Sequence, residues 1–82
     1  MYNIYVLYNR QAEKIYIGQT HDLTERLKLH KERTFKGYTS RFAGDWKLIY
    51  QESVPTRAQA LAREKQLKSY RGREFVKTFI PG

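Results

Sequence analysis

The chain has 82 residues, a formal net charge of +8 and no cysteine. This length corresponds to one domain near the small end of what folds alone. The lack of cysteine excludes disulfides, thiolate zinc sites and a cysteine nucleophile, and it fits a cytoplasmic location. No apolar run approaches the roughly 20 residues that span a bilayer, so we expect no membrane association. Residues 1–4 do not resemble a signal peptide.

Positive charge is concentrated in two segments, residues 26–47 and 57–73, whereas residues 1–25 carry more acidic than basic side chains. A strongly basic balance favours a polyanionic partner, most often DNA or RNA. A basic protein without such a partner would have the same composition. Any affinity for phosphate is expected from the two basic segments.

The first part of the chain predicts a β-hairpin. Residues 2–8 are rich in β-branched and aromatic types, which favour a strand, and residues 14–18 predict a second strand. The short polar link at residues 9–13 indicates that the two strands pair antiparallel. Residues 19–21 are expected to form a turn.

A helix is predicted next, from residue 23 to about residue 31. Asp22 is placed to cap its N-terminus, with Glu25 three residues later as the capping-box partner. Residues 32–45 are polar and basic, and a short helix is expected there at residues 39–42. Residues 46–52 predict a third strand.

The last third of the chain predicts a second long helix. Pro55 and Thr56 end the third strand, and Thr56 can cap a helix from residue 57 to about residue 70, because no breaker precedes Gly72. Residues 75–80 are expected to pack back as a strand or turn. The order β-β-α-α-β-α predicts a single α+β domain over residues 1–82, with a three-stranded antiparallel sheet flanked by helices.

Two tyrosines are candidates for a site on the hairpin. Alternation along the strands places Tyr5 on the face opposite Ile4 and Val6, and Tyr16 opposite Ile17. If both point the same way, two phenols lie together; the alternative is that both are ordinary core residues.

The first helix offers a cation beside this face. Arg26 and His30 lie next to an apolar stripe of Leu23 and Leu27, at the edge of the buried side. Arg26 could clamp a phosphate with its planar guanidinium. It could equally be a flanking side chain that extends to solvent.

The second helix carries an isolated carboxylate. Glu64 lies near the apolar side formed by Ala60, Leu61 and Leu67. A carboxylate against the core needs a partner, because an unpaired buried charge is costly. That partner could be a lysine or arginine, or a divalent cation.

Together these features resemble the GIY-YIG nuclease superfamily. The second half of its motif is intact at residues 16–18 (Tyr-Ile-Gly), and the first half reads Asn-Ile-Tyr at residues 3–5, with Asn3 in place of glycine. Residues 19–27 with His30, residues 38–39 and residues 62–68 also follow the family pattern. The chain is similar to the small stand-alone members and to the N-terminal nuclease domain of the excision-repair incision subunit.

This resemblance implies metal-dependent hydrolysis of DNA phosphodiester bonds, structure-selective or nonspecific, in DNA repair or processing. Tyr5, Tyr16, Arg26, His30 and Glu64 match the family's catalytic positions. Glu64 would hold a single Mg²⁺ (or Mn²⁺), and no small-molecule cofactor is expected. Tyr5 is the first candidate for the general base from the resemblance, although His30 has the better-matched pKa.

The remaining basic side chains are expected to hold DNA through its phosphates: Lys31, Arg33, Lys36, Arg41, Lys65 and Lys68. Two alternatives stay open. The domain could bind nucleic acid without cutting it, or it could act as an adaptor, a weak homodimer or part of a larger repair complex. In the second case Tyr2, Phe75 and Phe79 would form an interface if exposed.

Overall fold

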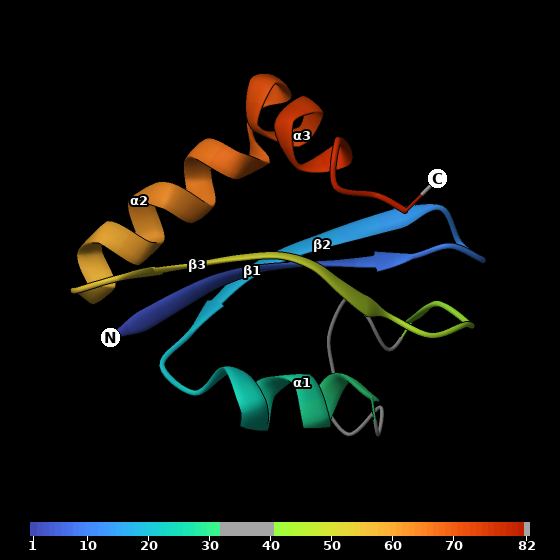
Figure 1. Cartoon of the computed structure of the whole chain (residues 1–82), viewed down its shortest axis with the longest axis horizontal. Helices are drawn as coiled ribbons and strands as arrows, with labels where there is room; N and C mark the ends of the chain where they lie inside the picture. The colour runs from blue at the N-terminus through green and yellow to red at the C-terminus, as the bar shows by residue number, and fades with distance from the viewer. Residues whose placement is uncertain (32–40, 82) are drawn as a thin grey trace.

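The computed structural model describes residues 1–31 and 41–81, with the side chain of Lys31 excepted (Figure 1). Within these residues the elements follow in the order β1 (Tyr2–Asn9), β2 (Lys14–Thr20), α1 (Leu23–Lys31), β3 (Lys47–Val54), α2 (Arg57–Lys68) and α3 (Tyr70–Lys77). The predicted α+β class and three-stranded antiparallel sheet are confirmed.

The sheet has the strand order β2-β1-β3, so β1 is the central strand. The predicted hairpin is present: β1 pairs antiparallel with β2, and Tyr5 lies opposite Gly18. β3 pairs with the other edge of β1, with an irregularity of register between Val6 and Leu7. β2 is therefore an edge strand, and side chains on it can reach around the edge of the sheet.

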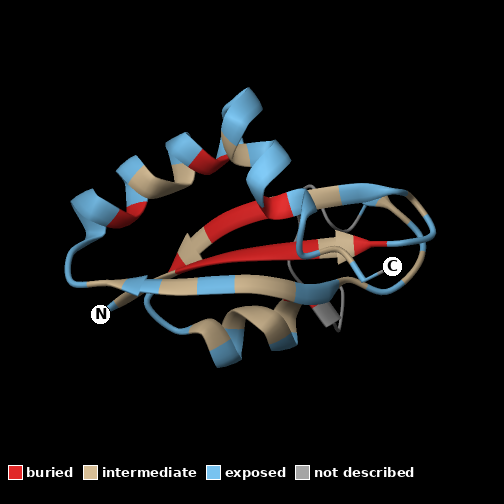
Figure 2. Ribbon diagram, turned by 45° about the horizontal axis from the view of Figure 1, so that its top comes forward, coloured by how far each residue is buried: buried red, intermediate tan, exposed pale blue. Residues whose placement is uncertain are grey.

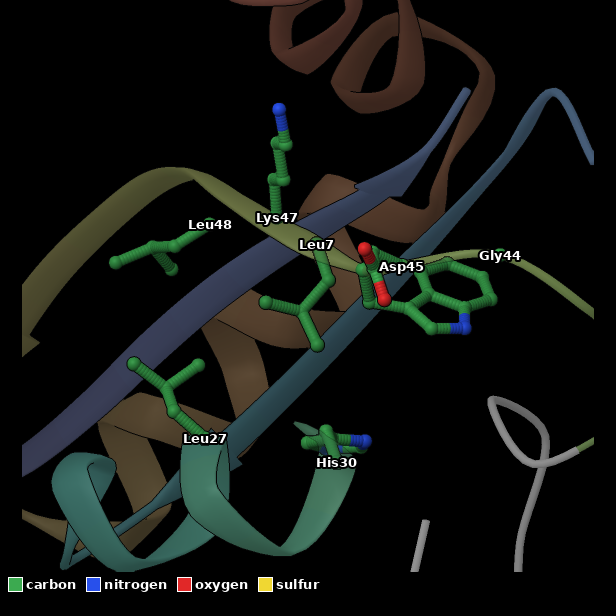
Figure 3. A pocket seen from close by; sticks show the side chains of 8 residues that line it. Leu7, Leu27, His30, Gly44, Asp45, Lys47 and Leu48 are labelled. Carbon is green, nitrogen blue, oxygen red and sulfur yellow. The ribbon is translucent and has the colours of Figure 1, made fainter. Parts of the chain in front are cut away.

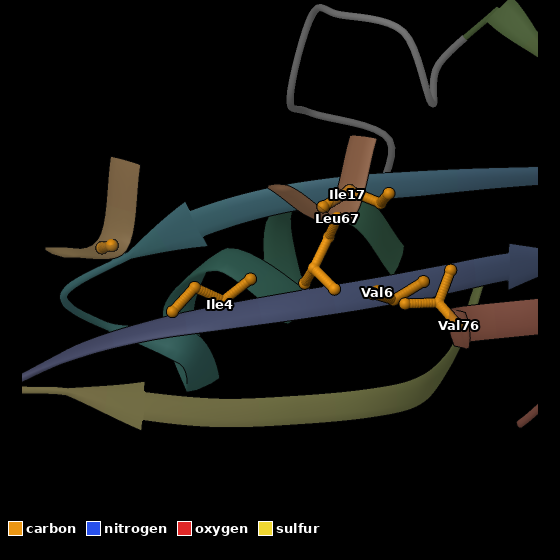
Figure 4. Close-up of a cluster of buried hydrophobic side chains, with 6 residues drawn as sticks. Ile4, Val6, Ile17, Leu67 and Val76 are labelled. Carbon is orange, nitrogen blue, oxygen red and sulfur yellow. The ribbon is translucent and has the colours of Figure 1, made fainter. Parts of the chain in front are cut away.

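The two faces of the sheet have different partners (Figures 1 and 2). α2 and α3 cover one face, where the hydrophobic core lies (Figure 4), and α1 covers the other. The buried core residues are Ile4, Val6, Ile17, Ala60, Leu67 and Val76. Because strand side chains alternate, Tyr5 and Tyr16 point away from this core and toward α1.

Both predicted helix caps are present. Asp22 accepts a hydrogen bond from the Glu25 backbone N–H at 3.0 Å, and Thr56 accepts one from the Gln59 backbone N–H at 3.2 Å. The backbone N–H of Asp22 donates to the Thr20 hydroxyl at 3.1 Å, the place a capping box gives to the Glu25 carboxylate. Thr20 therefore fixes the entry into α1 from the end of β2.

The C-terminal prediction is wrong in two respects. α2 ends at Lys68, and of the segment predicted as a strand or turn, residues 75–77 belong to helix α3 and only residues 78–80 form a turn. Ser69 is the reason: its hydroxyl donates to the Gln66 carbonyl at 2.6 Å and accepts from the Gly72 backbone N–H at 3.2 Å. One serine thus caps the end of α2 and the start of α3.

Among the described residues, the third α-helix therefore follows α2. Of the short helix expected at residues 39–42, residues 39 and 40 lie outside the described residues, Arg41 has a 3₁₀-helical conformation and Phe42 lies in a bend. None of the helices in residues 1–31 and 41–81 is long and apolar enough to cross a membrane.

An ion pair attaches α2 to β3. Arg63 donates from Nε to Glu52 at 2.6 Å, and the Tyr50 hydroxyl donates to the same carboxylate. Burial alone would raise the pKa of Glu52, but the hydrogen bonds from Arg63 and Tyr50 outweigh burial and lower that pKa. The pair holds α2 in a fixed orientation across the sheet.

Candidate active site

Two tyrosines and a histidine meet between the sheet and α1. The ring centroids of Tyr5 and Tyr16 lie 6.0 Å apart, and that of His30 lies 5.9 Å from Tyr5 and 5.2 Å from Tyr16. The Tyr5 hydroxyl lies 3.2 Å from Nε2 of His30, a hydrogen-bond distance. Tyr5 and His30 are both buried, whereas Tyr16 is partly open to solvent. The sequence predicted the tyrosine pair, but placed His30 only at the edge of the buried face.

Gly18 makes room for this cluster. It lies opposite Tyr5 in the hairpin, and a Cβ atom at residue 18 would lie 2.9 Å from Cζ and the hydroxyl of Tyr5 and from Cε2 of Tyr16. A glycine is therefore required for close approach of the rings rather than for an unusual backbone angle. This gives the last residue of the Tyr-Ile-Gly motif a packing role.

Burial and neighbouring charges shift the pKa values of the buried Tyr5 and His30 in opposite directions. Burial raises the pKa of Tyr5, the neighbouring Tyr16 and Glu64 raise it further, and Arg26 only partly opposes them. Burial also lowers the pKa of His30, and the positive charge of Arg26 adds to this. At neutral pH Tyr5 is a phenol and His30 is a neutral imidazole. In the tautomer protonated at Nδ1, His30 accepts the Tyr5 proton at Nε2.

Glu64 approaches the cluster from the opposite layer. It lies on α2, half-buried, and is close enough to influence the pKa of Tyr5. Its carboxylate accepts a hydrogen bond from Lys68 Nζ at 2.9 Å. A pocket of about 310 Å³ at the β2 edge is lined by both Tyr16 and Lys68. The tyrosine side and the glutamate side of the sheet therefore meet at this edge.

The donor set near Glu64 fits an ion that shares its ligands with a substrate. Among the described residues, no group of three or more His, Asp or Glu side chains could enclose a metal ion. Mg²⁺ commonly keeps several waters and binds one or two carboxylates plus substrate phosphate, so one carboxylate suffices. The Lys68 partner is about half exposed, and ion pairs of this kind are weak enough to be exchanged.

The predicted DNA-binding side chains are only partly described. Arg41, Lys65 and Lys68 are exposed. Arg33 and Lys36 lie outside the described residues, and so does the side chain of Lys31. Lys68 lies directly beside the cluster through its bond to Glu64. The role of all six in holding DNA stays a prediction.

A further pocket beside His30 was not predicted. It measures about 390 Å³ and lies between α1 and the segment that leads into β3, with Leu7, Leu27 and Trp46 among its lining residues (Figure 3). Leu7 and Leu27 point into it from the sheet and from α1. The alternation that placed Tyr5 toward α1 also places Leu7 there, but only the tertiary structure brings Trp46 to them.

Comparison with known proteins shows the family to which the chain belongs. The model of the GIY-YIG catalytic domain family matches residues 1–77, and the chain belongs to this family. The solution NMR structure of a UPF0213 protein from Bacillus halodurans is similar, with a TM-score of 0.56 and 27% sequence identity over 100% of this chain and 88% of that chain. No curated protein gives a significant match.

Proposed function

We propose that the protein is a metal-dependent endonuclease that hydrolyses DNA phosphodiester bonds, structure-selective or nonspecific, in DNA repair or processing. One observation carries the proposal: a buried tyrosine hydrogen-bonded to a neutral histidine, with the charges of Arg26 and Glu64 both acting on that tyrosine. Metal-dependent phosphodiester hydrolysis uses a proton acceptor, a cation for the phosphoryl oxygens and a ligand, here a carboxylate, for a divalent ion. This cluster supplies all three.

His30 is the better proton acceptor on the grounds of charge state. The raised pKa of Tyr5 makes its phenolate scarce at neutral pH, whereas the lowered pKa of His30 keeps its imidazole neutral. We therefore assign a relay. The attacking water passes a proton to the Tyr5 oxygen as the Tyr5 proton moves to Nε2 of His30. The water oxygen bonds to phosphorus, and the ester P–O bond breaks.

The remaining residues hold the phosphate. Arg26 presents its guanidinium to the phosphoryl oxygens and neutralises charge that builds there. Glu64 would bind Mg²⁺ or Mn²⁺ in exchange for Lys68, and such an ion, when bound, polarises the phosphate and stabilises the leaving oxygen. Tyr16, partly exposed at the β2 edge, is placed to contact the substrate there.

The first prediction concerns Glu64→Gln. We expect it to reduce cleavage of plasmid and branched DNA in Mg²⁺ or Mn²⁺ by about 100-fold or more, because the neutral amide binds the ion poorly. Gel assays of initial rates measure this. Glu74→Gln is the matched control, since Glu74 lies in a similar helical ion pair, with Lys77 at 3.2 Å, on an exposed part of α3.

Three outcomes are distinguished. Cleavage lost with Glu64→Gln and kept with Glu74→Gln supports the enzyme. Equal cleavage by both variants contradicts the role of Glu64. DNA binding without cleavage by the unaltered protein would identify a non-catalytic nucleic-acid-binding module, and neither activity would leave the adaptor as the better account.

A further inference from the structure

A basic pocket lies at one end of the sheet, next to the cluster. The end of β2 and the starts of α1 and α2 come together at this end of the molecule (Figure 1). The pocket measures about 360 Å³. Its described lining residues are Tyr2, Gln19, Thr20, His21, Arg26 and Arg57. They include two arginines and no carboxylate, so the charged side chains that an anion meets in the pocket are positive.

Arg57 is placed where the fold gains nothing from its charge. It is the first residue of α2, and a cation at a helix N-terminus is unfavourable because the exposed backbone N–H groups there carry partial positive charge. It also lines the same pocket as the like charge of Arg26. Among the described residues Arg57 has no hydrogen-bond or ion-pair partner, whereas Arg63, on the same helix, is bonded to Glu52.

The pocket is displaced from the tyrosines by about one nucleotide. Gly18, which contacts Tyr5, and Thr20, which lines the pocket, lie two residues apart on the same face of β2. Two residues of a strand span about 6.6 Å, which is comparable with the separation of neighbouring phosphates along a nucleic-acid strand. Arg26 belongs to both places, because it lines the pocket and acts on the pKa of Tyr5.

We propose that this pocket binds the backbone phosphate next to the one that is cleaved, with Arg57 as its dedicated ligand and Arg26 shared between the two phosphates. The guanidinium of Arg57 presents several N–H donors to phosphate oxygens, and the N-terminus of α2 adds its partial positive charge. The inference rests on the proposed nuclease function. It adds a second phosphate contact that holds the DNA strand in register across the cluster.

The test measures binding without catalysis. Binding of branched DNA in the absence of divalent metal is followed by fluorescence anisotropy from about 50 to 200 mM salt, and log K is plotted against log salt concentration. Arg57→Gln is expected to weaken binding several-fold and to reduce the magnitude of the slope by about 0.9, the value for one lost phosphate contact on duplex DNA. Arg10→Gln, an exposed arginine outside both basic segments and outside this pocket, should leave the slope unchanged.

A second measurement locates the phosphate. In Mg²⁺, DNA carrying one neutral methylphosphonate on either side of the mapped cleavage position is compared with unmodified DNA. The neutral group at one of these positions should slow cleavage by the unaltered protein but not slow Arg57→Gln further. Equal salt slopes for the two arginine variants, or additive losses at both positions, overturn the inference. The proposed nuclease function is unaffected by either result as long as the unaltered protein cleaves DNA. Conversely, a reduced slope in a protein that cuts nothing supports the pocket and rejects the enzyme.

Discussion

The tyrosine–glycine pair at the centre of the hairpin explains how two ordinary strand residues form a site. Gly18 has no side chain, and the Tyr5 ring occupies the space where one would lie. Tyr5 is fully buried, so its hydroxyl cannot turn away from His30 without disturbing the packing around it. The lack of a Cβ atom at Gly18 therefore leaves the space that the Tyr5 ring occupies beside His30.

Gly18→Ala is expected to move the phenol and to cost both stability and activity. The added Cβ would lie 2.9 Å from the Tyr5 hydroxyl, and overpacking at such a site costs about 1–3 kcal/mol of unfolding free energy. Cleavage should fall at the same time, because the bond to His30 is broken. Urea unfolding followed by circular dichroism gives the first quantity, and initial rates give the second.

Tyr5→Phe provides the control for this prediction. It removes the hydroxyl but leaves the ring, so part of the steric clash disappears. In the Tyr5→Phe background Gly18→Ala should therefore cost less stability than in the unaltered protein, which a double-mutant cycle measures. Additive losses of stability would show that Gly18 acts elsewhere than on the Tyr5 hydroxyl.

For single residues, the sequence predicts the face on which a side chain lies better than how deeply that side chain is buried. Strand alternation is enough to place Tyr5 and Tyr16 on one face. The burial of His30 depends on how α1 docks beneath the sheet, which helical periodicity does not specify. Arg57 was not singled out, because in the sequence it is one of several basic residues in the segment 57–73 and its relation to Arg26 is purely tertiary.

The junction between α2 and α3 shows where prediction of elements fails. The sequence around Gly72 suggests a helix breaker, and helix formers continue through Lys68, so a single helix ending near Tyr70 was expected. Instead Ser69 divides the segment, and Gly72 lies inside the following helix. Tertiary packing overrides the low helix propensity of glycine, because α3 buries Val76 in the core.

Gly72→Ala should be severely destabilising although it replaces glycine by the best helix former. A Cβ atom at residue 72 would lie 2.1 Å from the Gln66 carbonyl oxygen and 2.4 Å from Cα of Leu67, both backbone atoms that cannot turn aside. We expect a loss of at least about 3 kcal/mol in unfolding free energy, measured by urea denaturation. The neighbouring Arg71→Ala should change it by less than about 0.5 kcal/mol, since Arg71 is exposed.

Both substitutions place alanine in the same turn of α3, and Gly72→Ala gains more helix propensity than Arg71→Ala, so a loss of stability with Gly72→Ala must come from packing. If Gly72→Ala were neutral or stabilising, helix propensity would dominate and the close contact of α2 with α3 would be refuted. A loss confined to this variant would show that the angle between the two helices depends on a backbone contact. That angle positions Val76 against the core and leaves Phe75 and Phe79 beside Tyr50 on the surface.

At the scale of the molecule, the site depends on both helical layers. His30 and Arg26 come from the layer below the sheet, and Glu64 comes from the layer above it. In the proposed mechanism they reach one substrate around β2, which is an edge strand. The sequence predicted the three strands, whereas the catalytic constellation that it suggests stays a prediction. Which layer supplies which side chain follows from the docking of the helices, and that depends on long-range contacts.

The buried histidine also makes global stability depend on pH, which is the last prediction. The pKa of His30 in the folded protein lies below its ordinary value of 6.5, owing to burial and to Arg26. Between these two pKa values the unfolded chain binds more protons than the folded one, so protonation favours unfolding. The contribution of His30 to the free energy of unfolding should not change with pH above about pH 7.5. It should then fall as the pH decreases through 6.5 toward the folded pKa.

The slope can reach about 1.4 kcal/mol per pH unit for a single group, and urea unfolding at intervals between pH 5.5 and 8 measures it. His30→Asn removes the titrating group while keeping a polar side chain against Tyr5, so its stability should vary less over this range. Glu52 does not confound the comparison, because its lowered pKa places its own loss of stability further toward acid pH. Equal slopes for the two proteins would mean that folded His30 takes up its proton as readily as the unfolded chain does. The imidazole would then be charged through much of this range, and the relay from Tyr5 would lose its acceptor.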